Sequence, residues 1–406
     1  MKLDLSFEKG KDGNKGRKGG DDGEGGRSIF GKKTARAKGT ALNCFLFLTL
    51  SQKNELYQEE AAMKKLIVSL LVTLALMMGV VVSQVGYAAE QEKYTLYFLS
   101  HIGPADPNMR WLTIAIEDFM KRYPEVEVRY VATETFSIKQ QVEDVETAIA
   151  AGADGLIVPI TDPTALEDAL RRAVDAGIPV VAANIPDPRP APEKIPYLTY
   201  VGGDEYLVGV KLGQNLLQAW QDGRVPKPVK VMVPIHHVGH IGLEYRAKGM
   251  TDAMKEIGVP VEKLAIGDEP TKAKQIMTSY LSVNPDVNVI FCVAAWSAPW
   301  AYEVASDLEL DPDVDNKGVT ILCVDASPVA LEGIIAGKVL ATHSQGFYLQ
   351  GYLPPEWLYF YLHFGYTPPP EIITGPIIID NTNVEKWKKL VMTVFGEKTY
   401  KELVLW

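Results

Sequence analysis

Short apolar runs alternate with helical repeats along most of the chain, and the stretch 148–184 shows this pattern most clearly. Gly155–Val158 and Val180–Ala183 are apolar runs, and the residues between them carry apolar side chains at helical spacing. Asp162 provides an N-cap acceptor directly before a proline, and Gly177 ends the helical pattern. Two buried strands that flank one amphipathic helix predict a right-handed βαβ unit of a parallel sheet.

The ends of these two predicted strands form the first candidate binding region. In open α/β sheets, ligands bind beyond the carboxyl ends of the strands. Pro159–Thr161 and Asn184–Asp187 directly follow the two strands, so we expect both segments to lie near a ligand.

The same alternation continues through residues 94–344 in two series. In the first, we predict strands at 94–100, 126–131, 155–158, 180–183 and 197–201, with helices at 109–123, 137–151 and 163–176. In the second, we predict helices at 206–220, 241–257, 272–281, 298–307 and 328–336, with strands at 229–233, 264–267, 289–293, 319–324 and 340–344. A further helix at 354–362 precedes a break at Pro368–Pro370. Two series of domain size predict an α/β fold with two similar lobes.

Composition and charge narrow the class of partner. The chain has 406 residues and a formal net charge of −10. Binding to phosphates needs a basic face, so we expect no nucleic acid partner. The cysteines, Cys44, Cys292 and Cys323, do not make a disulfide framework. Cys292 and Cys323 each lie in an apolar strand-like run, which predicts buried thiols.

Residues 1–62 differ in composition from the rest of the chain. Most of this stretch is rich in Gly, Lys, Arg and Asp and too poor in apolar residues to form a core. From Met63, two lysines, a long apolar run and Gly86–Ala88 follow the order of a secretory signal peptide with its cleavage site. We therefore predict a cleaved signal peptide at 63–88 and a periplasmic or extracytoplasmic mature protein.

We interpret residues 1–62 as a disordered or spuriously translated leader, with Met63 as the true start. Gln58–Glu60 can be encoded by CAGGAGGA, which contains a ribosome-binding sequence at a suitable distance before the Met63 codon. The alternative is an uncleaved membrane anchor with a basic cytoplasmic tail. No cysteine stands at the predicted cleavage site, so the sequence does not support a lipid anchor.

Motifs for catalysis and metal binding are scarce. The chain has neither of the common Gly-rich phosphate loops nor a Gly-x-Ser-x-Gly elbow. The best metal candidate is the cluster His236-His237-x-x-His240, although no carboxylate follows it until Glu244. We favour histidines that line a cleft or face solvent, and we predict no catalytic residue, metal site or cofactor.

Aromatic and planar polar side chains at predicted strand ends favour a sugar site instead. Such sites combine aromatic faces, which stack on C–H patches, with planar polar groups that make bidentate hydrogen bonds. In this chain the aromatic candidates follow two predicted strands, and the planar candidates lie just past strand ends or at helix starts. The candidate ligand-binding residues are Met109, Trp111, Asn184, Arg246, Trp296, Asp325 and Gln345.

Residues 94–382 carry stretches such as GADGLIVPITDPTAL, VGGDEYLVGVKLGQNL and ILCVDASPVALEGIIAGKVLATHSQ. In these stretches the chain resembles the periplasmic ribose/galactose-type sugar-binding proteins of ABC importers, whose fold is shared by lactose-repressor regulators. The resemblance implies the type I periplasmic binding protein fold, which is α/β with two Rossmann-like lobes, parallel sheets and a three-crossing hinge. It also implies a monomer that closes on a sugar-like ligand and docks to an ABC permease in the inner membrane.

The resemblance further assigns lobes and ligand contacts. It implies an amino-terminal lobe at 94–203 plus 346–373 and a carboxy-terminal lobe at 204–345 plus 374–395. By position, Arg246 matches the family's cleft arginine, Asp325 its sugar-binding aspartate and Gln345 its glutamine near the last crossing. Met109 and Trp111 stand where the family places its first-loop aromatics.

Two positions depart from the family pattern. After the fourth strand the family commonly has Asp-Arg, where this chain has Asn184-Ile185. After the strand at 289–293 it commonly has Asn-Asp, where this chain has Ala294-Ala295 followed by Trp296. The chain loses hydrogen-bonding groups and gains a stacking surface, which favours a polyol, a deoxy sugar or another small polar ligand over ribose.

We therefore predict a solute-binding protein, not an enzyme, that captures a small sugar or polyol and delivers it to an ABC permease. A sensory protein that presents its ligand to a chemoreceptor or kinase has the same fold and stays the alternative. A transcription regulator is disfavoured, because a signal peptide stands where a DNA-binding helix-turn-helix is expected. An enzyme needs a nucleophile–base or metal constellation, which the sequence does not show.

Overall fold

The computed structural model of the chain describes residues 60, 63–75, 77, 92–104, 106–132, 134, 136–310 and 318–406. These residues belong to two compact units, 1–89 and 90–406. In the first unit the described residues are helical. Among all described residues, no helix is long and apolar enough to span a membrane. The predicted leader, apart from Glu60, and the predicted cleavage site at Gly86–Ala88 lie outside the described residues.

Six parallel strands form the first sheet of the second unit, in the order β11-β5-β4-β3-β1-β2. The strands are β1 (Tyr94–Ser100), β2 (Val126–Ala132), β3 (Gly155–Val158), β4 (Val180–Ala183), β5 (Thr199–Gly203) and β11 (Glu371–Gly375). The helices of this lobe are α2 (Met109–Arg122), α3 (Ile138–Ala150), α4 (Pro163–Asp175) and α10 (Phe347–Phe364).

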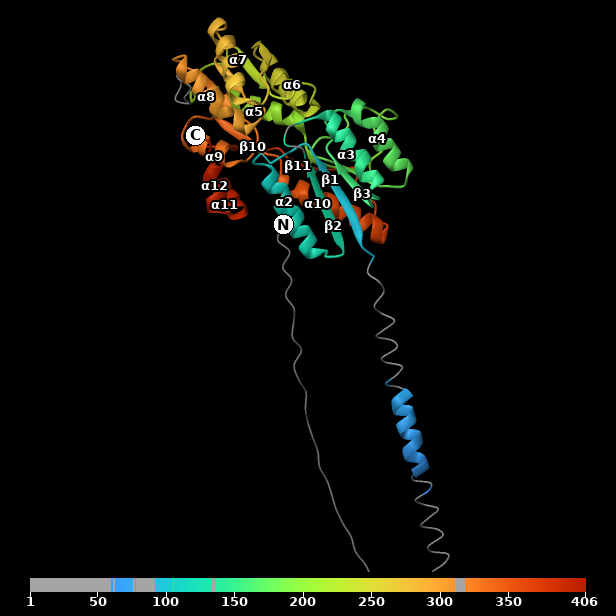
Figure 1. Cartoon of the computed structure of the whole chain (residues 1–406). Helices are drawn as coiled ribbons and strands as arrows, with labels where there is room; N and C mark the ends of the chain where they lie inside the picture. The colour runs from blue at the N-terminus through green and yellow to red at the C-terminus, as the bar shows by residue number, and fades with distance from the viewer. Residues whose placement is uncertain are drawn as a thin grey trace, which may run out of the picture. The chain divides into compact units, whose positions relative to one another are not determined.

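Side chains of β1 point alternately to the two faces of this sheet, as the period of two along a strand requires. Leu96 and Phe98 pack in the core with residues of α2 and α10. Tyr97 and Leu99 pack in the core with residues of α3 and α4. Figure 1 shows α10, from late in the chain, lying beside α2 from its beginning. Both faces of the sheet are therefore covered at its centre, which explains why β3 and β4 are wholly apolar.

Four parallel strands form the second sheet, in the order β7-β6-β8-β9. The strands are β6 (Val231–Ile235), β7 (Val261–Ala265), β8 (Val289–Phe291) and β9 (Thr320–Leu322). The helices are α5 (Glu205–Gln221), α6 (Ile241–Lys255), α7 (Pro270–Val283), α8 (Ala298–Asp307) and α9 (Pro328–Ile335), with the 3₁₀ turn η1 (Ala295–Ser297) before α8. Cys292 and Cys323 are buried free thiols, as predicted.

The chain passes between the two sheets three times, which gives two Rossmann-like lobes with a three-stranded hinge. The passages lie between β5 and α5, between β10 (Ala341–Ser344) and α10, and between β11 and β12 (Ile377–Asp380). β10 and β12 pair antiparallel beside the second sheet. Two last helices, α11 (Val384–Phe395) and α12 (Glu397–Glu402), pack beside α9 (Figure 1). The exact lobe boundaries given above stay a prediction.

Most predicted elements agree with the structure to within a few residues, and the differences have physical causes. The strand predicted at 197–201 is β5, and the strand predicted at 264–267 is β7, which begins three residues earlier at Val261. β7 lies at the sheet edge with mostly exposed or half-buried side chains, so its apolar signal is weak.

The helix predicted at 354–362 is only the second half of α10. Pro354 and Pro355 stand inside it, although an interior proline costs a helix about 3 kcal/mol. Packing of α10 against α2 and the first sheet compensates for this cost. The strands β11 and β12 and the helices α11 and α12 were not predicted. β11 and β12 are short, and their side chains are mostly exposed or half-buried. Their isoleucine runs, 372–373 and 377–379, were too short to be assigned as strands.

Candidate functional site

A cavity of about 650 Å³ lies at the carboxyl ends of strands from both sheets. Its volume is typical of sites for small molecules. Loops that follow β1, β2, β4, β6, β8, β9 and β10 contribute to its lining. The lining residues that matter below are His101, Asp106, Asn108, Phe136, Asn184, His236, His237, His240, Arg246, Trp296, Trp300, Asp325, Gln345 and Leu405.

The structure brings most of the predicted ligand-binding residues to this cavity. Asn184, Arg246, Trp296, Asp325 and Gln345 all line it. They come from positions far apart in the sequence and meet because parallel strands end at the same edge of each sheet. Whether each of them contacts a ligand stays a prediction.

Met109 and Trp111 are not brought to the cavity. Trp111 is buried in the core, where its ring meets Phe395 edge-on with 5.0 Å between ring centroids, and Met109 packs against the same core. Trp111 Nε1–H donates to the carbonyl of Ala326 at 3.4 Å. The sequence placed α2 correctly but not its rotation, because both residues lie on the face that packs into the protein.

The segment Pro159–Thr161 also lies outside the cavity lining. Thr161 is fully buried and donates its hydroxyl hydrogen to Gln141 Oε1. Gln141 Nε2 in turn donates to the carbonyl of Pro159 at 2.7 Å. The expectation that this segment lies near a ligand is therefore wrong, and its polar groups instead fix the end of β3 to α3.

Residues of the first loop take the place that was predicted for Met109 and Trp111. His101, Asp106 and Asn108 from this loop line the cavity, and Phe136 joins them from the loop after β2. Sequence reasoning missed all four as residues of the cavity lining. The available signal was a polar loop, His101 to Asn108, directly after a buried strand, which is where function is commonly found.

A chain of hydrogen bonds, here called the polar network, joins Asn108, Asp325, Gln345 and Asn184 across the two lobes. Asn108 Nδ2 donates to Asp325 Oδ2 at 3.0 Å, and Gln345 Nε2 donates to Asp325 Oδ1 at 2.6 Å. Asn184 Nδ2 donates to Gln345 Oε1 at 3.1 Å. All these side chains are buried, so each amide group is fixed in one orientation before any ligand arrives.

Two members of the polar network have left-handed backbone conformations. Asn184 has φ of 67° and Asp325 has φ of 76°. Short polar side chains tolerate this region better than other non-glycine residues, although it is still strained. Such strain persists only where the surroundings hold it, and it clusters at binding sites. At these two positions it turns the side chain from the strand end toward the cavity.

Arg246 brings a positive charge to the cavity wall from α6. Its Nε bonds to the Glu205 carboxylate on α5, and its Nη1 donates to the carbonyl of Val293 at 2.8 Å. The two helices approach closely at Gly209, where a Cβ atom would lie 2.0 Å from the carbonyl oxygen of Arg246. This close packing places the buried carboxylate of Glu205 directly beside the guanidinium.

The acidic groups around Arg246 keep their protons to a higher pH than usual. Burial raises the pKa of Glu205 and of Asp325, against the opposing effect of Arg246. Burial and repulsion from Asp325 raise the pKa of Asp106 to about 7. The Asp106 carboxyl accepts a hydrogen bond from the backbone N–H of Asn108 at 2.8 Å. A carboxyl with this pKa can donate or accept a hydrogen bond to a ligand hydroxyl near neutral pH.

Ring side chains from both lobes form a second region of the lining, here called the aromatic wall. Phe136 stacks on His237 with 4.6 Å between ring centroids and an interplanar angle of 19°. His236 meets Trp296 edge-on at 4.7 Å, and Trp296 meets Trp300 at 4.8 Å. The members of the aromatic wall are His101, Phe136, His236, His237, His240, Trp296 and Trp300.

Burial lowers the pKa of every histidine in this wall, which favours neutral rings at physiological pH. Burial lowers the pKa of His101 to about 3 and the pKa values of His236 and His240 well below 6.5. Within the described part of the chain, His101 Nδ1 and His236 Nδ1 are buried without a hydrogen-bond partner. No group of three or more described His, Cys, Asp or Glu residues has an arrangement that holds a metal ion. The neutral rings offer a donor and an acceptor each, as hydroxyl groups require.

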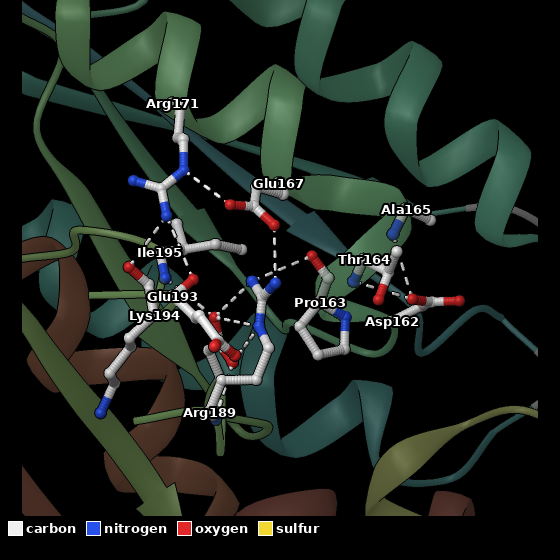
Figure 2. Close-up of polar contacts among 11 residues, drawn as sticks. Asp162, Pro163, Thr164, Ala165, Glu167, Arg171, Arg189, Glu193, Lys194 and Ile195 are labelled. Atoms are coloured by element: carbon white, nitrogen blue, oxygen red, sulfur yellow. Dashed lines mark hydrogen bonds and ion pairs between the residues drawn. The ribbon is translucent and has the colours of Figure 1, made fainter. Parts of the chain in front are cut away.

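The loop between β4 and β5 begins at Asn184 and is fixed by a network of charges. Arg189 Nη2 lies 2.8 Å from the buried Asp187 carboxylate, and Arg189 Nη1 lies 2.6 Å from Glu167 on α4. Figure 2 shows Arg189 reaching toward Glu167, with Arg171 on the other side of that carboxylate. Asp187 therefore positions the loop, while Asn184 is the residue of this segment that reaches the cavity.

Comparison with known proteins gives consistent likenesses. The model of the family described as periplasmic binding protein domain matches residues 102–365. A xylose/arabinose-binding protein of Sulfolobus acidocaldarius is 27% identical over 308 residues, which are 74% of this chain and 75% of that protein.

Two solved structures have the same fold. A periplasmic sugar-binding protein of a Legionella pneumophila ABC sugar transporter is 26% identical with a TM-score of 0.61, and the alignment covers 70% of this chain and 100% of the other. A carbohydrate transporter of Acidothermus cellulolyticus, in complex with myo-inositol, is 24% identical with a TM-score of 0.64, covering 74% and 99%.

Proposed function

Because the chain belongs to the periplasmic binding protein family, we propose that it captures a small sugar or polyol between its two lobes and delivers it to an ABC permease. The observation that carries this proposal is the pairing of the polar network with the aromatic wall in one cavity. Planar amide, carboxylate and guanidinium groups suit hydroxyl pairs, and ring faces suit C–H patches. The cavity thus offers both kinds of surface that a polyhydroxylated ring presents.

The charges of the cavity disfavour an anionic ligand. Arg246 is paired with Glu205, and Asp325 is bonded to Gln345 and Asn108. Burial lowers the pKa of each histidine in the aromatic wall, which favours the neutral form. An anionic ligand would have to leave water for a cavity whose arginine, Arg246, already has a partner, which is costly. A neutral sugar or polyol does not meet this cost.

The names of similar proteins support the same class of ligand. The relative from Sulfolobus acidocaldarius is a binder of the pentoses xylose and arabinose, and the Acidothermus cellulolyticus structure contains myo-inositol, a cyclic polyol. The Asn184 side chain also fits this class. Its Nδ2 donates to Gln345 at 3.1 Å and to Gln350 at 2.9 Å. The amide hydrogens are therefore used within the protein, and fewer are available to ligand hydroxyls.

Capture requires closure of the two lobes around the ligand. Phe136 from the first lobe touches His237 and His240 from the second, so the structure has the lobes in contact at the cavity. A ligand that contacts both lobes binds this closed form better than an open one, and its binding shifts the population toward closure. The closed form is then the one that a permease recognises, without any chemical change in the ligand.

We also propose that the protein is exported through cleavage of the signal peptide at 63–88 and works as a monomer. Amino-terminal sequencing of the protein from its host is expected to begin at or near Ala89. Recovery of peptides from residues 1–60 in the exported form would overturn the proposed start at Met63.

A thermal-shift screen tests the proposed function. Purified protein is heated with pentoses, hexoses, inositols and deoxy sugars, each at millimolar concentration. A ligand present at about 100 times its Kd stabilises the folded state by about 2.7 kcal/mol, which raises Tm by several degrees. The proposal is contradicted if no sugar or polyol shifts Tm while a charged solute, such as an amino acid, does.

A further inference from the structure

The segment from Val384 to Trp406 bridges the two lobes next to the ligand cavity. Its helix α11 packs against α9 of the second lobe and against α2 of the first. Phe395 of α11 meets Trp111 of α2 edge-on at 5.0 Å. Figure 1 shows α11 and α12 side by side below α9. The segment lies beyond residue 365, where the match to the family model ends.

Polar and ionic contacts hold this segment to α9. Tyr400 of α12 is buried, and its hydroxyl donates to Glu332 Oε1 at 2.8 Å. Lys388 Nζ of α11 lies 2.6 Å from the same carboxylate oxygen. Both helices therefore converge on one side chain of α9, which fixes the path of the residues that follow.

Trp406 is fixed in the same way. Its Nε1–H donates to the carbonyl of Val329 at 2.6 Å, and Lys338 Nζ lies 4.8 Å from the centre of its ring. A Cβ atom at Gly333 would lie 2.5 Å from the Trp406 ring, so this glycine makes room for the indole. Trp406 is therefore held in a fixed position against α9.

Leu405 lies between these fixed residues and lines the ligand cavity. Its backbone has φ of 59°, a left-handed conformation that is uncommon for a leucine. The contacts of Tyr400 and Trp406 on either side hold this conformation. The isobutyl group is thereby presented to the same cavity as Trp296 and Trp300.

We propose that Leu405 is a specificity-determining residue that selects sugars without an exocyclic hydroxymethyl group, an inference that rests on the proposed function. An alkyl side chain cannot donate or accept a hydrogen bond, so a ligand hydroxyl placed against it loses its bonds to water without replacement. Pentoses are therefore accepted in preference to the hexoses that differ from them by that group alone.

Calorimetry with D-xylose and D-glucose tests this selection, since the two differ only in the hydroxymethyl group. The wild-type protein is expected to bind D-xylose more tightly. Leu405→Ala is expected to lower the ratio of the Kd for D-glucose to the Kd for D-xylose by about tenfold. This is the size of effect expected for a small change in an apolar pocket. Trp406→Ala removes the indole that holds the residue next to Leu405 against α9. This variant is expected to lower the same ratio.

Leu390→Ala is the matched control. Leu390 lies on α11 of the same segment, is exposed to a similar degree (47%, against 55% for Leu405) and does not line the cavity. This variant is expected to keep the wild-type ratio. Leu405 is exposed, so its truncation leaves the core intact.

The outcomes separate this inference from the proposed function. An unchanged ratio in Leu405→Ala, an equal change in Leu390→Ala, or a wild-type preference for D-glucose overturns the selection and leaves the proposed function standing. A wild-type protein that binds only inositols does the same. A wild-type protein that binds no sugar or polyol overturns both.

Discussion

The polar network and the aromatic wall line the same cavity but are built in different ways. In the polar network, Asp325 and Gln345 are buried and joined by short hydrogen bonds, so their geometry is fixed. In the aromatic wall, Trp296 is half-buried, and contacts such as that of Phe136 with His237 join the two lobes through ring faces alone. Hydrogen bonds are directional and ring contacts are not. The network therefore supplies orientation, while the wall supplies area and adapts to the ligand.

The largest effect is expected at Arg246, which supports the polar end of the cavity. Arg246→Ala leaves the Glu205 carboxylate buried without its partner, which costs about 3–5 kcal/mol of folding stability. Urea denaturation measures this loss. A double variant, Arg246→Met with Glu205→Met, removes both charges and so separates the effect on stability from the effect on binding. The double variant is expected to recover most of the stability but not the ligand affinity, and a double variant that binds normally would exclude Arg246 from the site.

Asp325→Ala tests the polar network itself. The substitution removes the acceptor shared by Asn108 and Gln345 and any bond from Asp325 to ligand. We expect affinity to fall by about 2–4 kcal/mol, as for loss of one partner of a buried charged hydrogen bond. Isothermal calorimetry measures this fall. Full affinity in this variant would show that the network is structural only.

A pH series separates the histidines of the aromatic wall from Asp106, the carboxyl beside the polar network. The unfolded chain protonates histidines below about pH 6.5, whereas the depressed pKa values of His101 and His240 keep these rings neutral in the folded protein. The unfolded state then binds more protons, so each ring removes about 1.4 kcal/mol of stability per pH unit as pH falls below 6.5. Asp106, with its raised pKa, acts in the opposite direction below about pH 7.

Two variants resolve these opposed contributions in the free energy of unfolding between pH 7 and 5. His240→Gln is expected to reduce the loss of unfolding free energy between pH 7 and pH 5. Asp106→Asn is expected to increase that loss. His343 provides the control, because its pKa is also lowered to about 3 by burial but it does not line the cavity. His343→Gln is expected to change the pH dependence of unfolding and to leave that of ligand affinity unchanged.

The smallest effect is expected at Trp296, in the aromatic wall. Trp296 lines the cavity from η1 and lies outside the hydrophobic core clusters of the described chain, whereas Trp300 packs against the core. Trp296→Ala is expected to weaken binding by about 0.5–1.5 kcal/mol in addition to the effect of the smaller buried area. The stability of the protein without ligand is expected to change little. Trp300→Ala is the comparison: because Trp300 also packs against the core, this variant is expected to lose folding stability. Calorimetry and urea denaturation distinguish the two, and a Trp296→Ala variant with full affinity rules out stacking.

The sequence predicted the fold better than the details of the site, for a physical reason. Buried parallel strands such as Gly155–Val158 leave a continuous apolar signal, and the predicted two-lobed α/β fold is confirmed. The positions of Arg246 and Asp325 at the cavity follow from where strands and helices end. Met109 and Trp111 show the limit, because a shift of less than one helical turn decides whether a side chain faces the core or the cavity.

Other features needed three-dimensional contacts that no local pattern reveals. Leu405 reaches the cavity only because Tyr400 and Trp406 are seated on α9. Phe136 follows a strand by several residues and meets His237 only through a contact between the two lobes. In the sequence, Glu205 is an acidic residue in the first turn of a helix, which is a common position for one. Only the packing of α5 on α6 shows that it is the partner of Arg246.

A crystal structure of the protein with its best-binding sugar or polyol tests the central claim most directly. We predict one ligand ring in the 650 Å³ cavity, with hydroxyl groups within hydrogen-bonding distance of Arg246 and Asp325 and a C–H face against Trp296. A ligand bound elsewhere on the protein, or one in this cavity that touches neither the polar network nor the aromatic wall, would contradict it.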